Sequence, residues 1–156
     1  MKLISLALIC CGFACASLAS DYEPLNIKGI APGMPKDKVA RTLGTYEPRC
    51  SMEKTLEYCP YYPVSLAGDD VTMTVAFWRG AVVHAQISDV VNTATVKYAL
   101  KKKYGPPALE QGLDTAWLEK GILLRVDELK DFVSISDNEK FKMAIEEDTA
   151  AALDDI

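Results

Sequence analysis

Histidine is nearly absent from this chain: His84 is the one imidazole among 156 residues. Many catalytic centres use histidine as a base, and many metal centres use it as a ligand, so its scarcity excludes most of those arrangements. The sequence also lacks a Gly-x-Ser-x-Gly nucleophile motif, a glycine-rich phosphate loop and a calcium-binding loop. We therefore predict a protein that is not an enzyme, with neither a cofactor nor a metal site.

Positive charge is also in short supply, with 17 Lys and Arg against 22 Asp and Glu and a formal net charge of -5. A general nucleic-acid-binding protein needs a cationic surface, so this balance argues against one. The remaining composition, 49% hydrophobic and 25% charged, is that of a folded domain. The length predicts a single domain over residues 20–156.

Long apolar runs are lacking after the first twenty residues, which argues against a transmembrane helix. Residues 1–19 themselves are typical of a secretory signal peptide, because Lys2 precedes an apolar run and Ser17 and Ala19 have the small side chains of a cleavage site. We predict export to the periplasm or the medium. The alternative is a lipoprotein, which the residues before each leader cysteine disfavour: Cys10, Cys11 and Cys15.

Cysteine becomes rare once this leader is removed, since Cys50 and Cys59 alone remain. A pair of cysteines in an exported protein most often forms a disulfide, and the short loop would add about 2.5–3 kcal/mol of stability. Two buried free thiols are the alternative. A structural zinc site needs four ligands, and His84 lies far away in the sequence.

Local signals in the first half predict a helix followed by a hairpin. Pro35 suits the first helical position and Gly44 the end, so we expect a helix over 35–43. Residues 45–70 contain several prolines and are expected to be irregular, with one strand near 55–58. The period-2 alternation of 71–78 and the returning strand 81–88 predict a hairpin.

The second half repeats this order. A helix is expected from Asn92 or Thr93 to Tyr104, followed by a hairpin of 115–118 with 122–126. A strand at 132–136 and a last helix capped by Asn138 complete the order, and three side chains of that helix are expected to face inward: Phe141, Ala144 and Ile145.

The two halves, about 27–90 and 91–148, therefore resemble each other in the order of their elements. Each half alone would bury too little apolar surface to be stable. We predict an α+β fold, with one antiparallel sheet, helices on one face and the other face exposed. The repeated order predicts a tandem repeat of helix-plus-hairpin modules.

One motif carries a family resemblance. The run Gly33-Met34-Pro35-Lys36-Asp37-Lys38-Val39, followed by Leu43-Gly44, resembles the Gly-Met-Ser/Thr-x-x-x-Val…Leu-Gly signature of the small outer-membrane assembly lipoproteins and their relatives with the β-lactamase-inhibitor-protein fold. The resemblance implies a short, exported helix-then-sheet module. Pro35 stands where the family has a hydroxyl cap, and no lipid-attachment motif is evident, which weakens an assembly role.

Aromatic residues supply the candidate binding surface. Tyrosine offers a large contact area with few rotatable bonds, and a crosslinked loop loses little entropy on binding. Trp78 is expected to point outward from its strand. The alternative is that these rings cover a small second core. The candidate partner-binding residues are Tyr46, Tyr58, Tyr61, Tyr62 and Trp78.

These observations favour an exported, non-enzymatic module that binds a protein partner. In its sharper form, the protein inhibits or neutralises an enzyme in the periplasm, and its acidic charge steers it to a basic target. The alternative is a structural or assembly factor of the cell envelope, as the lipoprotein resemblance implies.

Overall fold

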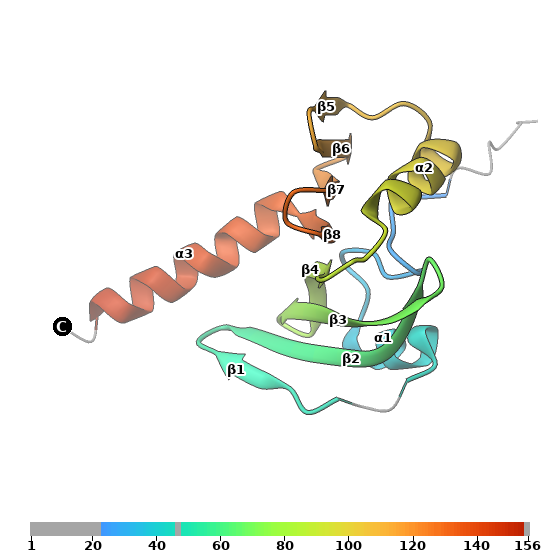
Figure 1. Cartoon of the computed structure of the whole chain (residues 1–156). Coiled ribbons are helices and arrows are strands. Elements are labelled where there is room, and N and C mark those ends of the chain that lie inside the picture. Colours follow the sequence, from blue (N-terminus) through green and yellow to red (C-terminus); the bar gives the residue numbers. More distant parts are fainter. Residues whose placement is uncertain (1–22, 46–47, 155–156) are drawn as a thin grey trace, which may run out of the picture.

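The computed structural model describes residues 23–45 and 48–154 and has an α+β fold (Figure 1). Within the described residues, eight strands form one antiparallel sheet that three helices accompany. The elements in chain order are α1 (Lys36–Leu43), β1 (Ser51–Glu53), β2 (Leu56–Leu66), β3 (Asp69–Trp78), β4 (Ala81–Ile87), α2 (Thr93–Tyr104), β5 (Leu109–Gln111), β6 (Asp114–Glu119), β7 (Ile122–Asp127), β8 (Phe132–Asp137) and α3 (Asn138–Asp154).

The strand order across the sheet is β1-β2-β3-β4-β8-β7-β6-β5. The fourth strand of each half therefore lies at the centre, where Ala85 of β4 pairs with Ile135 of β8. Each half consists of a helix followed by four strands, and α3 follows the second half. The predicted α+β class and antiparallel sheet are confirmed.

Local sequence signals place α1 and α2 where they were expected. Pro35 has an extended backbone and is the N-cap of α1, one position before its predicted place. Gly44 ends that helix with a φ of 66°, a left-handed conformation that costs glycine little. The side chain of Asn92 caps α2 by accepting a hydrogen bond from the Thr95 amide at 3.1 Å.

The expectation of an irregular segment over 45–70 is wrong, because β1, β2 and the start of β3 together occupy most of it. The one strand expected there, near 55–58, coincides with the start of β2. Pro60 and Pro63 lie within this strand, although proline cannot donate a ladder hydrogen bond. β1 pairs with β2 only at 56–58, so the rest of β2 is a sheet edge, where proline is tolerated. The short strand β5 was also not predicted.

The main core lies between the sheet and the pair α1 and α2. Val39 of α1 and Val96 of α2 pack in one cluster with inward-facing strand residues such as Met73, Leu124 and Ile135. The predicted stripe of β3 is confirmed, since its inward residues are all buried: Val71, Met73, Val75 and Phe77.

The expectation that all helices cover one face is wrong for α3, which packs on the opposite face. Phe141 and Ala144 cover a second cluster that includes Leu56, Ala76 and Trp78. The helix follows β8 without a loop, so it begins at the end of the sheet and its first turns fall on this face. Ile145 is 47% exposed, so its predicted inward orientation is also wrong.

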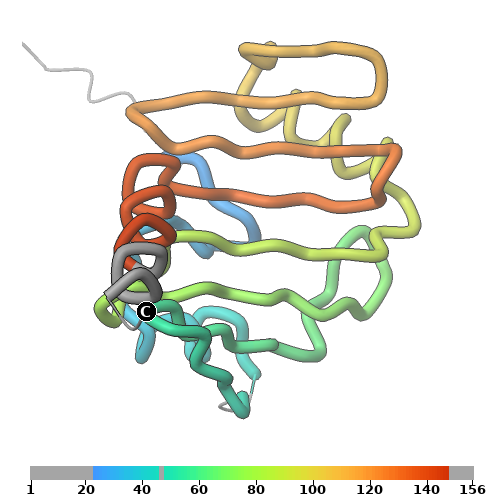
Figure 2. The backbone as a smooth tube through the Cα atoms, turned by 90° about the vertical axis from the view of Figure 1, so that its left-hand side faces the viewer, coloured from blue at the N-terminus to red at the C-terminus, as the bar shows by residue number. Residues whose placement is uncertain are grey.

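Figure 2 looks onto the face that carries α3, which is seen nearly end-on over one end of the central strands. The helix projects away from the sheet, as Figure 1 also shows, so it covers only part of this face. Within residues 23–45 and 48–154, no helix is long and apolar enough to cross a membrane.

Candidate functional site

The part of the sheet that α3 leaves uncovered carries a row of polar side chains. Thr74, Gln86, Ser134 and Arg125 are cross-strand neighbours on β3, β4, β8 and β7. They share a face with Ala76, because residues two apart along a strand point the same way. We call this surface, together with Tyr62 at its edge, the open face.

A hollow of about 260 Å³ lies at one end of the open face. Tyr62, on β2, lies beside a register shift between Tyr61 and Val64 and is 61% exposed. The hollow is lined by Tyr62, Asp70, Val71, Thr72, Thr74, Ser88 and Asp89. We call it the acidic hollow, because its lining includes two exposed carboxylates and no lysine or arginine.

The acidic hollow is suited to a cationic side chain. Asp70 and Asp89 make no ion pair with any residue that the structure describes, so their charges are not compensated locally. An exposed phenol ring attracts a cation through its π face, and the nearby carboxylates add Coulombic attraction. A lysine or arginine from a partner would find both here.

The other predicted binding aromatics do not join Tyr62. The ring of Tyr61 is 1% exposed and belongs to the main core, so its predicted contact with a partner is wrong. Trp78 is 9% exposed under α3, where its Nε1 donates a hydrogen bond to Glu147 at 3.1 Å. Tyr58 is half-buried against the same cluster, and Tyr46 lies outside the described residues. The alternative of a small second core therefore holds for Trp78 and Tyr58.

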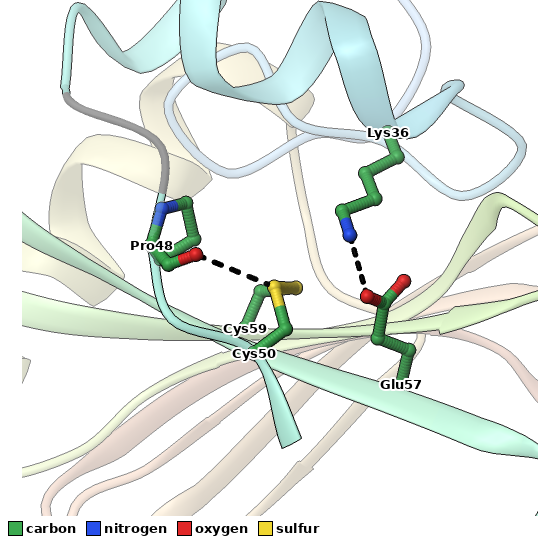
Figure 3. Close-up of a disulfide and its surroundings, with 5 residues drawn as sticks. All are labelled: Lys36, Pro48, Cys50, Glu57 and Cys59. Carbon is green, nitrogen blue, oxygen red and sulfur yellow. Dashed lines mark hydrogen bonds and ion pairs between the residues drawn. A yellow bond between two sulfur atoms is a disulfide. The ribbon is translucent and has the colours of Figure 1, made fainter. Parts of the chain in front are cut away.

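The predicted disulfide is confirmed: Cys50 and Cys59 are joined, and the bond ties the residue before β1 to β2 (Figure 3). Lys36 of α1 reaches Glu57 at 2.5 Å beside it. The Glu57 carboxylate lies within 4.8 Å of both sulfur atoms, a spacing that could hold a metal ion. Because the two sulfurs are bonded to each other, the cluster does not offer thiolate ligands.

His84 lies on β4 and contacts α3. Its imidazole stacks on Phe141, with ring centroids 5.0 Å apart. The Nδ1 atom is buried and has no hydrogen-bond partner among the described residues. Burial lowers the pKa of His84, and a hydrogen bond with Gln86 opposes that shift. The side chain therefore serves packing and stays neutral at pH 7.

This burial predicts a stability that falls as the pH falls. The folded pKa of His84 lies below its unfolded value of about 6.5, so the unfolded state binds the proton first. The stabilisation is complete above pH 6.5 and is lost as the pH falls toward the folded pKa. We expect the free energy of unfolding of the wild type to drop more between pH 7.5 and 5.5 than that of His84→Gln, by at most about 1.4 kcal/mol per pH unit.

Urea denaturation at each pH measures this difference. Glu23, Glu110 and Asp137 have lowered pKa values and titrate below this window, so they do not mask it. Parallel pH profiles of the two proteins would contradict the assignment of the slope to His84.

Sequence reasoning missed most of the acidic hollow. In the sequence, Asp70 follows Gly68 and Asp69 in a turn pattern, where carboxylates are normally solvated, and Asp89 belongs to no motif. The available signal was the alternation of β3, because the polar residues Thr72 and Thr74 stand opposite a buried stripe. No family model, curated protein or solved structure matches this chain. The resemblance to the assembly lipoproteins and the inhibitor-protein fold stays a prediction.

Proposed function

We propose that the protein is an exported, non-enzymatic module that holds a protein partner on the open face, with a basic side chain of the partner in the acidic hollow. One observation carries the proposal: Tyr62 is exposed beside two carboxylates that no described cation pairs with. The disulfide supports export, because such bonds persist in oxidising compartments. In its sharper form, the partner is a basic enzyme that the protein inhibits.

The open face fits a partner that binds and leaves. It carries the polar row Thr74, Gln86, Ser134 and Arg125, and Arg125 is already held by Asp114 at 2.8 Å and Asp127 at 3.1 Å. Interfaces of separable complexes are about as polar as the rest of a protein surface, and a few residues carry most of their binding energy. Tyr62 is the residue of that kind on this face.

We also propose that the two halves are tandem repeats. Each half gives a helix and then four strands, and the strand order is mirrored about the junction of β4 and β8. The sequence predicts no equivalent of the acidic hollow in the second half, because a tyrosine close to two prolines, as at Tyr62, occurs among the strands in β2 alone. Binding is therefore assigned to the first half.

Affinity capture from a periplasmic extract tests the proposal. We expect a partner that the wild type recovers, and a loss of about tenfold or more with Tyr62→Ala. Tyr98→Ala is the matched control, because Tyr98 is 72% exposed on α2, on the opposite side of the sheet. Each variant is first compared with the wild type by circular dichroism and thermal unfolding.

Equal recovery of the partner by the wild type and Tyr62→Ala would show that the open face does not bind it. The captured partner is then assayed: loss of its activity at one-to-one stoichiometry supports inhibition. An envelope-assembly component without enzymatic activity would favour the alternative role.

Because electrostatic steering acts on association, the double change Asp70→Asn and Asp89→Asn is expected to slow association and reduce its dependence on salt.

A further inference from the structure

A groove of about 360 Å³ lies on the helix side of the sheet, away from the open face. It runs between α2, the segment 23–29 and the turn that joins β2 to β3. More than half of its lining residues are apolar: Ile27, Leu66, Ala67, Val96, Ala99, Leu100 and Val133. A groove of this size and character lies within the range that small-molecule ligands occupy.

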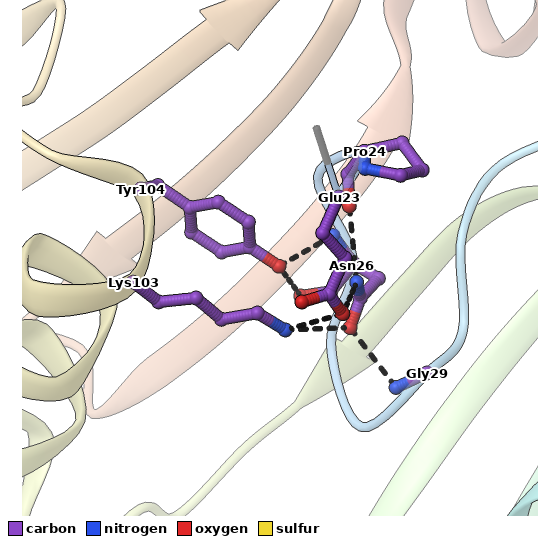
Figure 4. A network of polar contacts seen from close by, with 6 residues as sticks. All are labelled: Glu23, Pro24, Asn26, Gly29, Lys103 and Tyr104. Atoms are coloured by element: carbon purple, nitrogen blue, oxygen red, sulfur yellow. Dashed lines mark hydrogen bonds and ion pairs between the residues drawn. The ribbon is translucent and has the colours of Figure 1, made fainter. Parts of the chain in front are cut away.

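A polar network holds the segment 23–29 against α2, as Figure 4 shows. The Tyr104 hydroxyl accepts a hydrogen bond from the Asn26 amide at 3.1 Å and donates one to the Asn26 carbonyl at 3.2 Å. The Asn26 side chain donates to Glu23 at 2.9 Å and accepts from the Gly29 amide at 3.1 Å. The wall of the groove is therefore formed before any ligand arrives, so ordering it costs a ligand little.

Two lysines lie at this groove, and they differ in how their charge is compensated. Lys103 pairs with Glu23 at 2.8 Å, which raises the lysine pKa against burial and lowers the glutamate pKa. Lys28 is exposed and makes neither an ion pair nor a hydrogen bond with any described residue. An apolar groove with one uncompensated cation at its rim complements an apolar chain that ends in an anion.

We propose that this groove binds the hydrocarbon chain of a fatty acid, with the chain against the apolar wall and the carboxylate at the Lys28 ammonium. A groove of about 360 Å³ with one uncompensated lysine fits an apolar chain with one charged end better than a folded partner. This site is independent of the open face, since the sheet separates the two. It adds a small-molecule ligand to a protein whose proposed partner is a protein.

Isothermal titration calorimetry of the purified protein tests the proposal with octanoate, decanoate and dodecanoate, each below its micelle concentration. Burial of a CH₂ group contributes about 0.8 kcal/mol, so we expect affinity to rise up to about fourfold per added CH₂ until the chain exceeds the groove. Decanol and decyltrimethylammonium test the head group. We expect both to bind about two- to fivefold more weakly than decanoate, as for loss of an exposed ion pair.

Two substitutions with matched controls locate the site. Ala99→Trp fills the groove and is expected to weaken decanoate binding about tenfold or more, whereas Ala94→Trp, also exposed on α2 but outside the lining, is expected to leave it unchanged. Lys28→Gln is expected to remove the preference for decanoate over decanol, whereas Lys102→Gln keeps it. Thermal unfolding checks that each variant folds.

The outcomes decide the proposal. Saturable decanoate binding that Ala99→Trp weakens and Ala94→Trp does not supports it. Absence of heat from all three acids, or equal affinity in Ala99→Trp and Ala94→Trp, overturns the site. Equal binding of decanoate and decanol by the wild type overturns the role of Lys28. None of these measurements depends on the protein partner, so the two proposals fail separately.

Discussion

Replacing Tyr61 with alanine is expected to lower the free energy of unfolding by about 3–5 kcal/mol, as for other large buried aromatic residues. The ring is 1% exposed and packs in the cluster that joins the sheet to α1. Tyr62→Ala, one residue further on, is expected to change stability by no more than about 0.5 kcal/mol, because that ring is 61% exposed. Urea denaturation followed by circular dichroism measures both.

The pair provides its own control, because the two substitutions remove the same atoms at adjacent positions. We expect the opposite ranking in partner capture, with Tyr62→Ala impaired and Tyr61→Ala impaired only to the extent that it unfolds. A cost below about 1 kcal/mol for Tyr61→Ala would show that the ring is not part of the core. An unchanged slope against urea concentration confirms that the change lies in stability rather than in the unfolded state.

Loss of the disulfide is the second large effect. The bond closes a loop with a sequence separation of 9, and chain entropy then predicts a loss of about 2.5–3 kcal/mol on reduction. We expect the reduced wild type to unfold at a lower urea concentration than the oxidised protein by that amount. Reduction removes no sulfur or carbon atom from the protein, so the comparison isolates the crosslink.

The double variant Cys50→Ala and Cys59→Ala extends this test. It is expected to be less stable than the reduced wild type, because Cys59 is fully buried and its truncation adds a cavity. The neighbouring Lys36–Glu57 pair is partly exposed, with side chains 40% and 26% accessible, and contributes at most about 1 kcal/mol. Equal stability of the oxidised and reduced wild type would contradict the predicted role of the bond.

Local signals predicted most of the secondary structure. Pro35 and Gly44 bound α1, Asn92 caps α2, and alternation along β3 identified its buried stripe. These features depend on neighbours in sequence. β2 was missed because its prolines argue for a loop unless the strand lies at a sheet edge, and edge position is a property of the assembled sheet.

The candidate site was harder to predict, because it too depends on how distant elements pack in the assembled fold. The expected position of Trp78, on the face opposite the core stripe, is correct, but α3 covers that part of the face, and no local signal shows where a helix packs. The choice between Tyr61 and Tyr62 follows from the register of β2. Along a strand through 56–66, Tyr61 points to the same side as Cys59, because the two residues are two apart. Cys59 lies in the main core, so Tyr61 points inward and Tyr62 outward.

The central position of β8 has a consequence for how the chain matures. Until residues 132–137 have arrived, β4 and β7 each expose an unpaired ladder that β8 later fills from both sides. A nascent chain that ends before Phe132 would thus consist of two separate small sheets, each with one additional unpaired edge. Because this closure joins segments that lie far apart in sequence, we expect it to be a slow step of folding.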